Sequence, residues 1–167
     1  LAERELFDSE CFARSTEFIR KHANKKPFYC YMPIAFPHFP IIPHEDFKES
    51  TGNGDFADGL VELDTRVGYL LDELDALGIA DDTLFIFTSD NGVEEILPTR
   101  GWTGPWGGSY FTAMEGCLRV PFIARWPGHI PEGVVNNEIV HAVDMFTTLG
   151  AIGGAEIPDD RPIDGID

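Results

Sequence analysis

The chain has 167 residues, enough for one domain with a core, and its 43% hydrophobic, 12% aromatic and 25% charged residues are typical of a folded protein rather than a disordered one. Acidic residues outnumber basic ones by 29 to 12, giving a net charge of −17, so we expect no nucleic-acid partner and no membrane partner. No segment reaches transmembrane length, and the three cysteines have no spacing that fits a disulfide framework or a zinc site.

The first part of the chain predicts a helix, a strand and a proline-rich loop. Residues 8–23 have the pattern of a helix, with Asp8 or Ser9 as the N-cap. The apolar, aromatic run at 28–32 follows a basic turn and a proline, which favours a buried strand. The next segment, PHFPIIPHEDF, contains three prolines and therefore predicts an ordered loop without regular secondary structure.

The middle of the chain predicts a helix that packs on the core and then a buried strand. Leucine and valine recur at three- and four-residue steps from Leu60 to Leu77, and Gly78 follows as a helix stop. The strand expected at 84–87 is apolar and does not alternate with polar residues. A helix followed by such a strand favours an α/β protein with a parallel or mixed sheet covered by helices.

The expected strand runs directly into Asp90-Asn91-Gly92, which allows two interpretations. Asn-Gly is a strong signal for a two-residue hairpin, because both residues tolerate positive φ. In a parallel sheet, the same residues would instead lie at the carboxyl end of a strand, where α/β proteins bind their ligands. The residues after Gly92 are rich in glycine, proline and tryptophan and show no alternation, so the strand-end interpretation is favoured.

The last part of the chain predicts one more strand and one more helix. The strand is expected at 120–126, before Pro127-Gly128, and the helix at 139–149, before Gly150. Between the two expected strands, the glycine-rich segment 103–110 could cradle an anion with its backbone amides. It lacks the Gly-Lys-Ser/Thr ending of a P-loop and has no basic residue, so a close-packed loop is favoured.

Three residues are candidates for chemistry. Asp90 and Asn91 offer adjacent carboxylate and amide oxygens, ligands that suit Ca²⁺ or Mg²⁺, with an ordinary turn as the alternative. His38 lies between two prolines that stiffen its loop, and a rigidly held imidazole can donate a hydrogen bond or transfer a proton. An ordinary surface histidine is the alternative there, and we expect the other histidines to be surface or structural residues.

Four long stretches together resemble the sulfatase family of the alkaline-phosphatase-like superfamily. They are PFYCYMPIAFPHFP, VGYLLDELDALGIADDTLFIFTSDNG, AMEGCLRVPFIARWPGHIPEG and VHAVDMFTTL, and they occur in the order found in the family. The resemblance implies a mixed, largely parallel sheet flanked by helices. It also implies hydrolysis of sulfate esters, of small molecules or of carbohydrates, with the help of a divalent metal that is usually Ca²⁺.

The resemblance assigns roles to the three candidates. Asp90 and Asn91 match metal ligands at a strand end, and His38 matches a loop histidine that hydrogen-bonds the sulfate group or the leaving oxygen. Similar sulfatases tend to carry a basic residue, which would contact the sulfate, where this chain has Gly107. Gly107 therefore puts that contact in doubt, and Arg100 is the substitute available in the same loop.

Two further positions match the family as structural residues, and its nucleophile motif is absent. Glu115 and Arg119 are expected to form a buried pair. The family nucleophile is a cysteine in C-x-[PA]-x-R that is oxidised to formylglycine. The near-match CFARS fails because Ser15 stands where arginine is required, so Cys11 is expected to be a packing residue.

The resemblance also predicts what surrounds the chain. We expect residues 1–167 to be a single domain, the central to C-terminal part of a catalytic domain whose nucleophile and remaining metal ligands precede Leu1. By analogy with exported relatives, a periplasmic or extracellular location follows, and the chain alone is expected to be inactive. A phosphodiesterase or phosphonate hydrolase of the same superfamily, or a degenerate homologue that binds without cleaving, are the alternatives.

Overall fold

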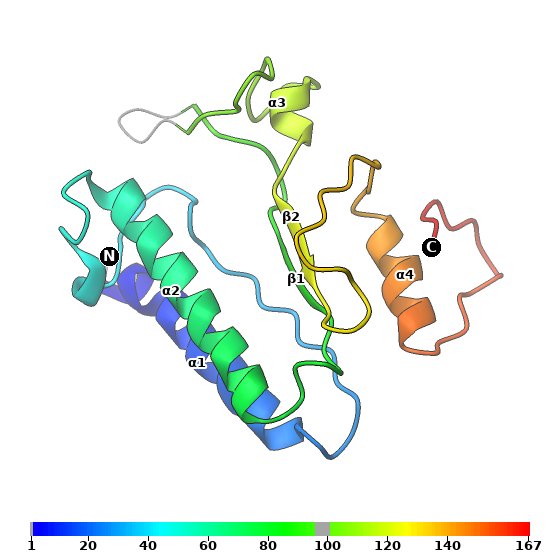
Figure 1. The fold of residues 1–167 in the computed structure, drawn as a ribbon. Coiled ribbons are helices and arrows are strands. Elements are labelled where there is room, and N and C mark those ends of the chain that lie inside the picture. The colour runs from blue at the N-terminus through cyan, green and yellow to red at the C-terminus, as the bar shows by residue number, and fades with distance from the viewer. Residues whose placement is uncertain (1, 96–100) are drawn as a thin grey trace. The chain divides into compact units, whose positions relative to one another are not determined.

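The structure is a computed structural model, and it describes residues 2–95 and 101–167. Its elements, in chain order, are α1 (Ala2–His22), η1 (Glu45–Phe47), α2 (Asp55–Ala76), β1 (Phe85–Thr88), α3 (Glu115–Leu118), β2 (Phe122–Arg125) and α4 (Asp144–Ile152) (Figure 1). They divide into two compact units, Leu1–Glu132 and Gly133–Asp167. Among the described helices, none is both long and apolar enough to cross a membrane.

Helix α1 begins before the predicted start, so the predicted N-cap at Asp8 or Ser9 is wrong. Acidic residues Glu3 and Glu5 lie in its first turn and basic residues in its last turn, an arrangement that favours the helix dipole. Asp8 is therefore inside the helix, where its backbone is already hydrogen-bonded and its carboxylate can bind another segment.

The core of the first unit lies between α1 and α2, which run side by side (Figure 1). Leu74, 2% exposed, and Leu70 pack from α2 against Phe12 and Ile19 of α1. The predicted apolar stripe is confirmed from Leu63 to Leu77, whose leucine and valine side chains belong to the core or pack against it. Leu60, where the stripe was expected to begin, is 47% exposed. The stop predicted after this helix is also confirmed, because Gly78 has a φ of 68°.

Residues 28–32 run extended but pair with no strand in the described part of the chain, so the predicted buried strand is wrong. Tyr29 and Tyr31 are 68% and 75% exposed, while Phe28 and Met32 pack against the core. The exposure thus alternates along the segment, as in a strand that is covered on one face only. A strand also needs backbone partners at its edge, and the described residues supply none here.

The two described strands lie close to their predicted positions and pair antiparallel, with the register Phe85↔Arg125 to Thr88↔Phe122. The largely parallel sheet expected from the sequence is not confirmed within the described residues, whose two strands form one antiparallel pair. The rejection of a tight hairpin at Asn91-Gly92 is confirmed, because β1 finds its partner only after a long connection that includes α3. The same connection includes the proline-, glycine- and tryptophan-rich loop.

In the second unit, α4 begins later than predicted and continues through Gly150. Asp144, its first residue, explains the late start: its carboxylate accepts hydrogen bonds from the N–H of His141 at 2.8 Å and of Ile166 at 3.0 Å. These two bonds lower the pKa of the Asp144 carboxyl. The buried Thr147 hydroxyl donates to the Ile166 carbonyl at 2.8 Å, so the C-terminal segment is held against this helix.

Candidate functional site

Asp90 follows the end of β1 and lies exposed. Its carboxylate makes no hydrogen bond or ion pair with any of the described residues. A carboxylate left free in this way can take an external ligand without first breaking a bond inside the protein. The placement at a strand end therefore agrees with either a ligand role or a solvated surface group.

The neighbouring Asn91 is half-buried, and its side chain is oriented by the backbone. Its Nδ2 donates to the Gly92 carbonyl at 2.8 Å, and the Ser89 hydroxyl donates to the Asn91 carbonyl at 3.3 Å. With the amide nitrogen held, the amide Oδ1 is the acceptor that remains available. Hard cations such as Ca²⁺ and Mg²⁺ prefer oxygen donors of this kind.

Gly92 ends this segment because backbone atoms pack directly against it. Its N–H donates to the Cys117 carbonyl at 2.7 Å, and a Cβ at this position would lie 2.1 Å from the Gly116 carbonyl oxygen. Gly116 is packed equally closely on the other side, where a Cβ would lie 2.2 Å from the Gly108 carbonyl oxygen. Three backbone segments thus pack against one another without side chains between them. The predicted close packing of the loop at 103–110 is confirmed at Gly108 only, since a Cβ on Gly104 would meet no atom within 4 Å.

Gly107 lies in the same loop but is less confined. Its carbonyl accepts from the Gly116 N–H at 2.9 Å, and a Cβ on Gly107 would meet only the terminal methyl of Met114, at 3.1 Å. The end of a flexible methionine can move aside, so the backbone has room for a side chain here. Arg100, the basic residue considered as a substitute, lies outside the described residues.

The predicted pair of Glu115 and Arg119 is confirmed, but its predicted burial is wrong. Arg119 Nε donates to Glu115 Oε2, and the two side chains are 55% and 56% exposed. The Arg119 guanidinium also lies 4.0 Å from the centre of the Trp106 ring. This cation–π contact joins the end of α3 to the glycine-rich loop.

His38 is exposed, and its imidazole is oriented by its own loop. Nδ1 lies 2.6 Å from the Phe39 carbonyl oxygen, and because a carbonyl can only accept, this nitrogen carries the proton and donates it. Nε2 is then the ring nitrogen that makes no hydrogen bond within the described residues. The His38 N–H donates to the Ala35 carbonyl at 2.8 Å and closes a turn. The peptide bonds before Pro37 and Pro40 are both cis.

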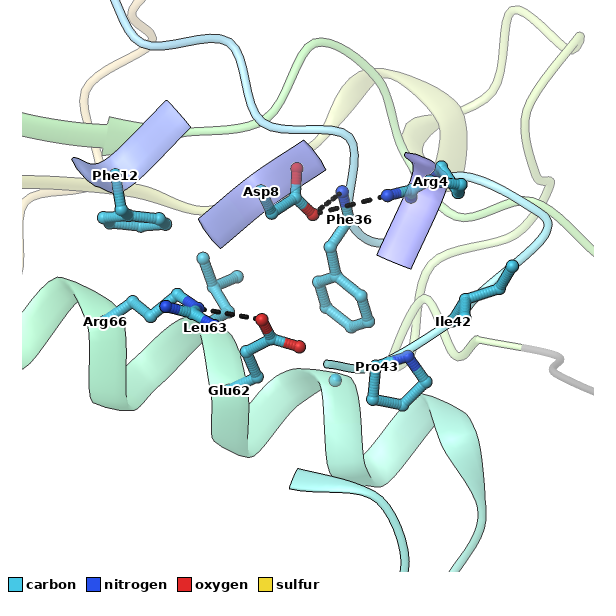
Figure 2. Close-up of a pocket in the computed structure, with 10 residues that line it drawn as sticks. Arg4, Asp8, Phe12, Phe36, Ile42, Pro43, Glu62, Leu63 and Arg66 are labelled. Carbon is cyan, nitrogen blue, oxygen red and sulfur yellow. Dashed lines mark hydrogen bonds and ion pairs between the residues drawn. The ribbon is translucent and has the colours of Figure 1, made fainter. Parts of the chain in front are cut away.

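Carboxylates on both helices hold the loop that carries His38, and the sequence analysis missed them. Asp8 accepts hydrogen bonds from the N–H groups of Ala35 and Phe36 at 2.6 and 2.9 Å, and Figure 2 shows the bond to Phe36. Glu62 accepts from the N–H of His44 at 2.7 Å. The sequence contains one feature that could have identified them, namely an acidic residue on the core-facing side of an amphipathic helix. Such a residue needs a partner that removes the cost of its burial.

Asp58 of α2 acts in the same way on the next part of the chain. It is 1% exposed and accepts from the Thr51 hydroxyl at 2.6 Å, the Thr51 N–H at 3.0 Å and the Glu49 N–H at 2.8 Å. These hydrogen bonds, with that of the Thr51 hydroxyl the strongest, lower the pKa of the Asp58 carboxyl although burial acts in the opposite direction.

The predicted catalytic and metal-binding residues are not connected to one another. No hydrogen bond or ion pair in the described part of the chain joins His38 to Asp90 or Asn91. Within residues 2–95 and 101–167, no cluster of three histidine, cysteine, aspartate or glutamate side chains could hold a metal. Because Ca²⁺ takes about six to eight oxygens, Asp90 and Asn91 could supply only part of a site.

The residues expected to be structural have partners that fit that role. Cys11 is half-buried with its sulfur 3.8 Å from the Pro33 carbonyl oxygen, and burial raises the pKa of its thiol. The His22 ring contacts the Phe18 ring at a tilt, with the ring centres 4.5 Å apart. Burial, followed by three nearby lysines, lowers the pKa of the His22 imidazole. His129 stacks on Trp126 with the ring centres 4.1 Å apart.

Sequence comparison with known proteins finds sulfatases. The family model described as Sulfatase matches residues 3–155. N-acetylgalactosamine-6-sulfatase of Rattus norvegicus is 39% identical over 154 residues, which are 90% of this chain and 29% of the rat protein. Arylsulfatase A of Homo sapiens is 39% identical over 143 residues, which are 85% of this chain and 28% of the human protein.

Solved structures, one of them a sulfatase, share the fold. The PsFucS1 sulfatase from Pseudoalteromonas sp. matches with a TM-score of 0.92 and 34% identity, over 98% of this chain and 33% of that one. Ps i-CgsB in complex with k-i-k-neocarrahexaose matches with a TM-score of 0.86 and 29% identity, over 95% of this chain and 36% of that one. The chain thus spans about three tenths of the length of its curated relatives. A family match over almost the entire sequence, together with this structural likeness, means that the chain belongs to the sulfatase family and shares the alkaline-phosphatase-like α/β fold of its members.

Proposed function

We propose that the protein containing this chain hydrolyses sulfate esters, and that its substrate is a sulfated carbohydrate. The observation that carries this proposal is the sulfatase match over residues 3–155. Two similar proteins support the choice of substrate class, because one is named an N-acetylgalactosamine-6-sulfatase and the other was solved in complex with a neocarrahexaose. A small aryl sulfate is the simpler substrate of the same chemistry.

In this proposal Asp90 and Asn91 are ligands of a divalent cation, Ca²⁺ or alternatively Mg²⁺. The donor set fits, because the Asp90 carboxylate is exposed without a partner among the described residues and the Asn91 amide is turned so that its oxygen is available. When bound, such a cation stabilises negative charge on the sulfate oxygens. The other ligands and the formylglycine nucleophile are expected outside residues 1–167.

His38 would bind the sulfate group or the leaving oxygen through Nε2. Because Nδ1–H is held by the Phe39 carbonyl, neutral His38 presents Nε2 as an acceptor, whereas the imidazolium form presents it as a donor. Donation to a sulfate oxygen, or protonation of the leaving oxygen, therefore requires the imidazolium form.

We further infer that residues 1–167 form a single domain and that its strands belong to a larger, mostly parallel sheet. In that sheet β1 and β2 form one antiparallel pair. Apolar side chains that the described residues leave uncovered support this inference. Ile123 of β2 is 60% exposed, and Tyr29 and Tyr31 of the extended segment are more exposed still. Large apolar side chains gathered at a sheet usually face another layer or strand.

The test uses the complete protein and release of 4-nitrophenol from 4-nitrophenyl sulfate. We expect Asp90→Ala to lower both the turnover and the affinity for Ca²⁺, measured by calorimetry after chelation. Asp82→Ala is the matched control, because Asp82 is also an exposed aspartate and its carboxylate makes no hydrogen bond or ion pair with the described residues. Equal metal affinity in Asp90→Ala and the unmodified protein would remove Asp90 from the metal site. Turnover of bis(4-nitrophenyl) phosphate in place of the sulfate ester would favour the phosphodiesterase alternative.

A further inference from the structure

The side chain of Asp8 binds the backbone just before His38. Its two carboxylate oxygens accept from the consecutive N–H groups of Ala35 and Phe36, at 2.6 and 2.9 Å. The Asp8 side chain is 14% exposed, so these bonds are largely shielded from water. Hydrogen bonds to an ionised acceptor are stronger than neutral ones, and two of them on adjacent residues fix both the position and the direction of the backbone.

Arg4, one helical turn before Asp8, binds the backbone of His38 itself. Its guanidinium lies 3.6 Å from the Asp8 carboxylate, and its Nη2 donates to the His38 carbonyl oxygen at 3.3 Å. The two side chains therefore hold the chain on both sides of Pro37 from one face of α1. Figure 2 shows Arg4 and Asp8 joined above the Phe36 ring.

The loop is also held from α2. Glu62 accepts from the His44 N–H at 2.7 Å with one oxygen and from Arg66 at 2.8 Å with the other. The Phe36 ring packs so closely on α2 that a Cβ on Gly59 would lie 2.3 Å from it. Both ends of the segment 35–44 are thus attached to helices, and His38 lies between the attachments.

The His38 imidazole depends on this attachment for its position. Its only hydrogen bond within the described residues is to the carbonyl of the next residue, so the ring moves with its own backbone. Arg4 and Asp8 line one pocket with Phe12, but they do not belong to the apolar cluster through which α1 packs on α2. Arg4 and Asp8 therefore contribute more to the position of the loop 35–44 than to the packing of α1 on α2.

We propose that Asp8 and Arg4 are positioning residues for His38, which hold its Nε2 at the substrate through the loop backbone. The proposal rests on the proposed function, in which His38 contacts the sulfate ester. A displacement of about 1 Å at a reacting group can cost on the order of 100-fold in rate. Removal of one of the two carboxylate bonds should therefore affect turnover more than substrate binding.

The experiment compares Asp8→Asn with His38→Ala and with the double variant in the complete protein, using 4-nitrophenyl sulfate. The amide of Asp8→Asn can accept only one of the two backbone hydrogen bonds. We expect kcat to fall by roughly 10- to 100-fold while KM changes less than about 2-fold. In the His38→Ala background the same substitution should change kcat by less than about 2-fold, because the group that it positions is gone. A merely destabilising substitution would lower activity equally in both backgrounds.

Asp58→Asn is the matched control, since Asp58 is a buried carboxylate of the same type that binds residues 49–51 instead of the loop at His38. We expect it to lower the melting temperature and leave kcat unchanged. An additive loss in the double variant, or an unchanged kcat in Asp8→Asn while His38→Ala is impaired, would overturn the positioning role and leave the proposed function intact. An unchanged kcat in His38→Ala would instead remove His38 from the proposed function.

A crystal structure of the Asp8→Asn protein gives a second readout that does not depend on activity. We expect the backbone at residues 35–38 to shift and the His38 imidazole to move by about 1 Å or to lose its density. The Asp58→Asn structure should keep the imidazole in place. An imidazole that is unmoved in Asp8→Asn would overturn the proposal even if the complete protein hydrolysed no sulfate ester.

Discussion

Replacing Gly92 by alanine would put a methyl group into space that backbone atoms already occupy. The added Cβ would lie 2.1 Å from the Gly116 carbonyl oxygen and 2.8 Å from both Cα and the carbonyl oxygen of Cys117. A carbon and a carbonyl oxygen in contact are normally about 3.3 Å or more apart, so the two segments must separate by roughly 1 Å. No side chain can rotate away, because every contacting atom belongs to the backbone.

The cost follows from two terms. Overpacking of a tight site costs about 1–3 kcal/mol, and weakening the 2.7 Å bond from the Gly92 N–H to the Cys117 carbonyl costs about 1 kcal/mol more. We therefore expect Gly92→Ala to lower the free energy of unfolding by about 2–4 kcal/mol. Because Asp90 lies only two residues earlier, we also expect weaker Ca²⁺ binding.

Urea unfolding of the complete protein, followed by circular dichroism, measures this change. Gly68→Ala is the control: Gly68 lies within α2, a Cβ there meets no atom within 4 Å, and alanine is the better helix former by about 1 kcal/mol. It should leave stability unchanged or raise it. If Gly92→Ala unfolds within about 0.5 kcal/mol of the unmodified protein, the close backbone packing inferred here is wrong.

Three further predictions concern the loop at Gly107, the titration of Asp58 and the activity of the chain alone. Gly107→Arg should change the free energy of unfolding by less than about 0.5 kcal/mol, because only the flexible end of Met114 lies close to the added side chain. The same substitution should lower KM for 4-nitrophenyl sulfate. An unchanged KM would mean that position 107 does not contact the sulfate. Because hydrogen bonds from Thr51 lower the folded-state pKa of Asp58 below its ordinary value of 3.8, its stabilising effect is present above pH 4 and is lost as the pH falls through the folded-state pKa. Urea unfolding between pH 5 and about pH 2 should therefore show a smaller loss of stability in Asp58→Asn than in the unmodified protein, and equal losses would contradict the assignment. The purified chain 1–167 should release no 4-nitrophenol from 4-nitrophenyl sulfate above buffer, and clear release would mean that it carries its own nucleophile.

The carboxylates on the helices explain how a proline-rich loop can be ordered without regular structure. Prolines remove N–H donors from the segment, and the donors that remain must still find acceptors when they are buried. Asp8 and Glu62 supply those acceptors from helices whose own backbone is already paired. From composition alone, these acidic residues would be expected on the solvated surface, but their side chains are mostly buried.

Much of the local structure could be predicted from the sequence. The apolar stripe of α2, the stop at Gly78 and the two short strands lie where the pattern of neighbouring residues placed them. The rejection of a hairpin at Asn91-Gly92 was also correct, because β1 pairs with β2, about thirty residues further along the chain. Periodicity and turn chemistry act over a few residues, so one sequence is enough to identify them.

Contacts between residues that are far apart in the sequence were decided only by the tertiary structure. The sequence could suggest Asp8 as an N-cap, but its carboxylate binds N–H groups 27 and 28 residues away. It could not show that β2 pairs antiparallel with β1, or that the other described residues leave Tyr29 and Tyr31 uncovered. Asp90, Asn91 and His38 were found as candidates from residue type and position, whereas Asp8 and Arg4 could not be connected with His38 before the loop was seen against α1. A hydrogen bond between distant residues depends on how the chain folds back, and a local pattern carries no information about that path.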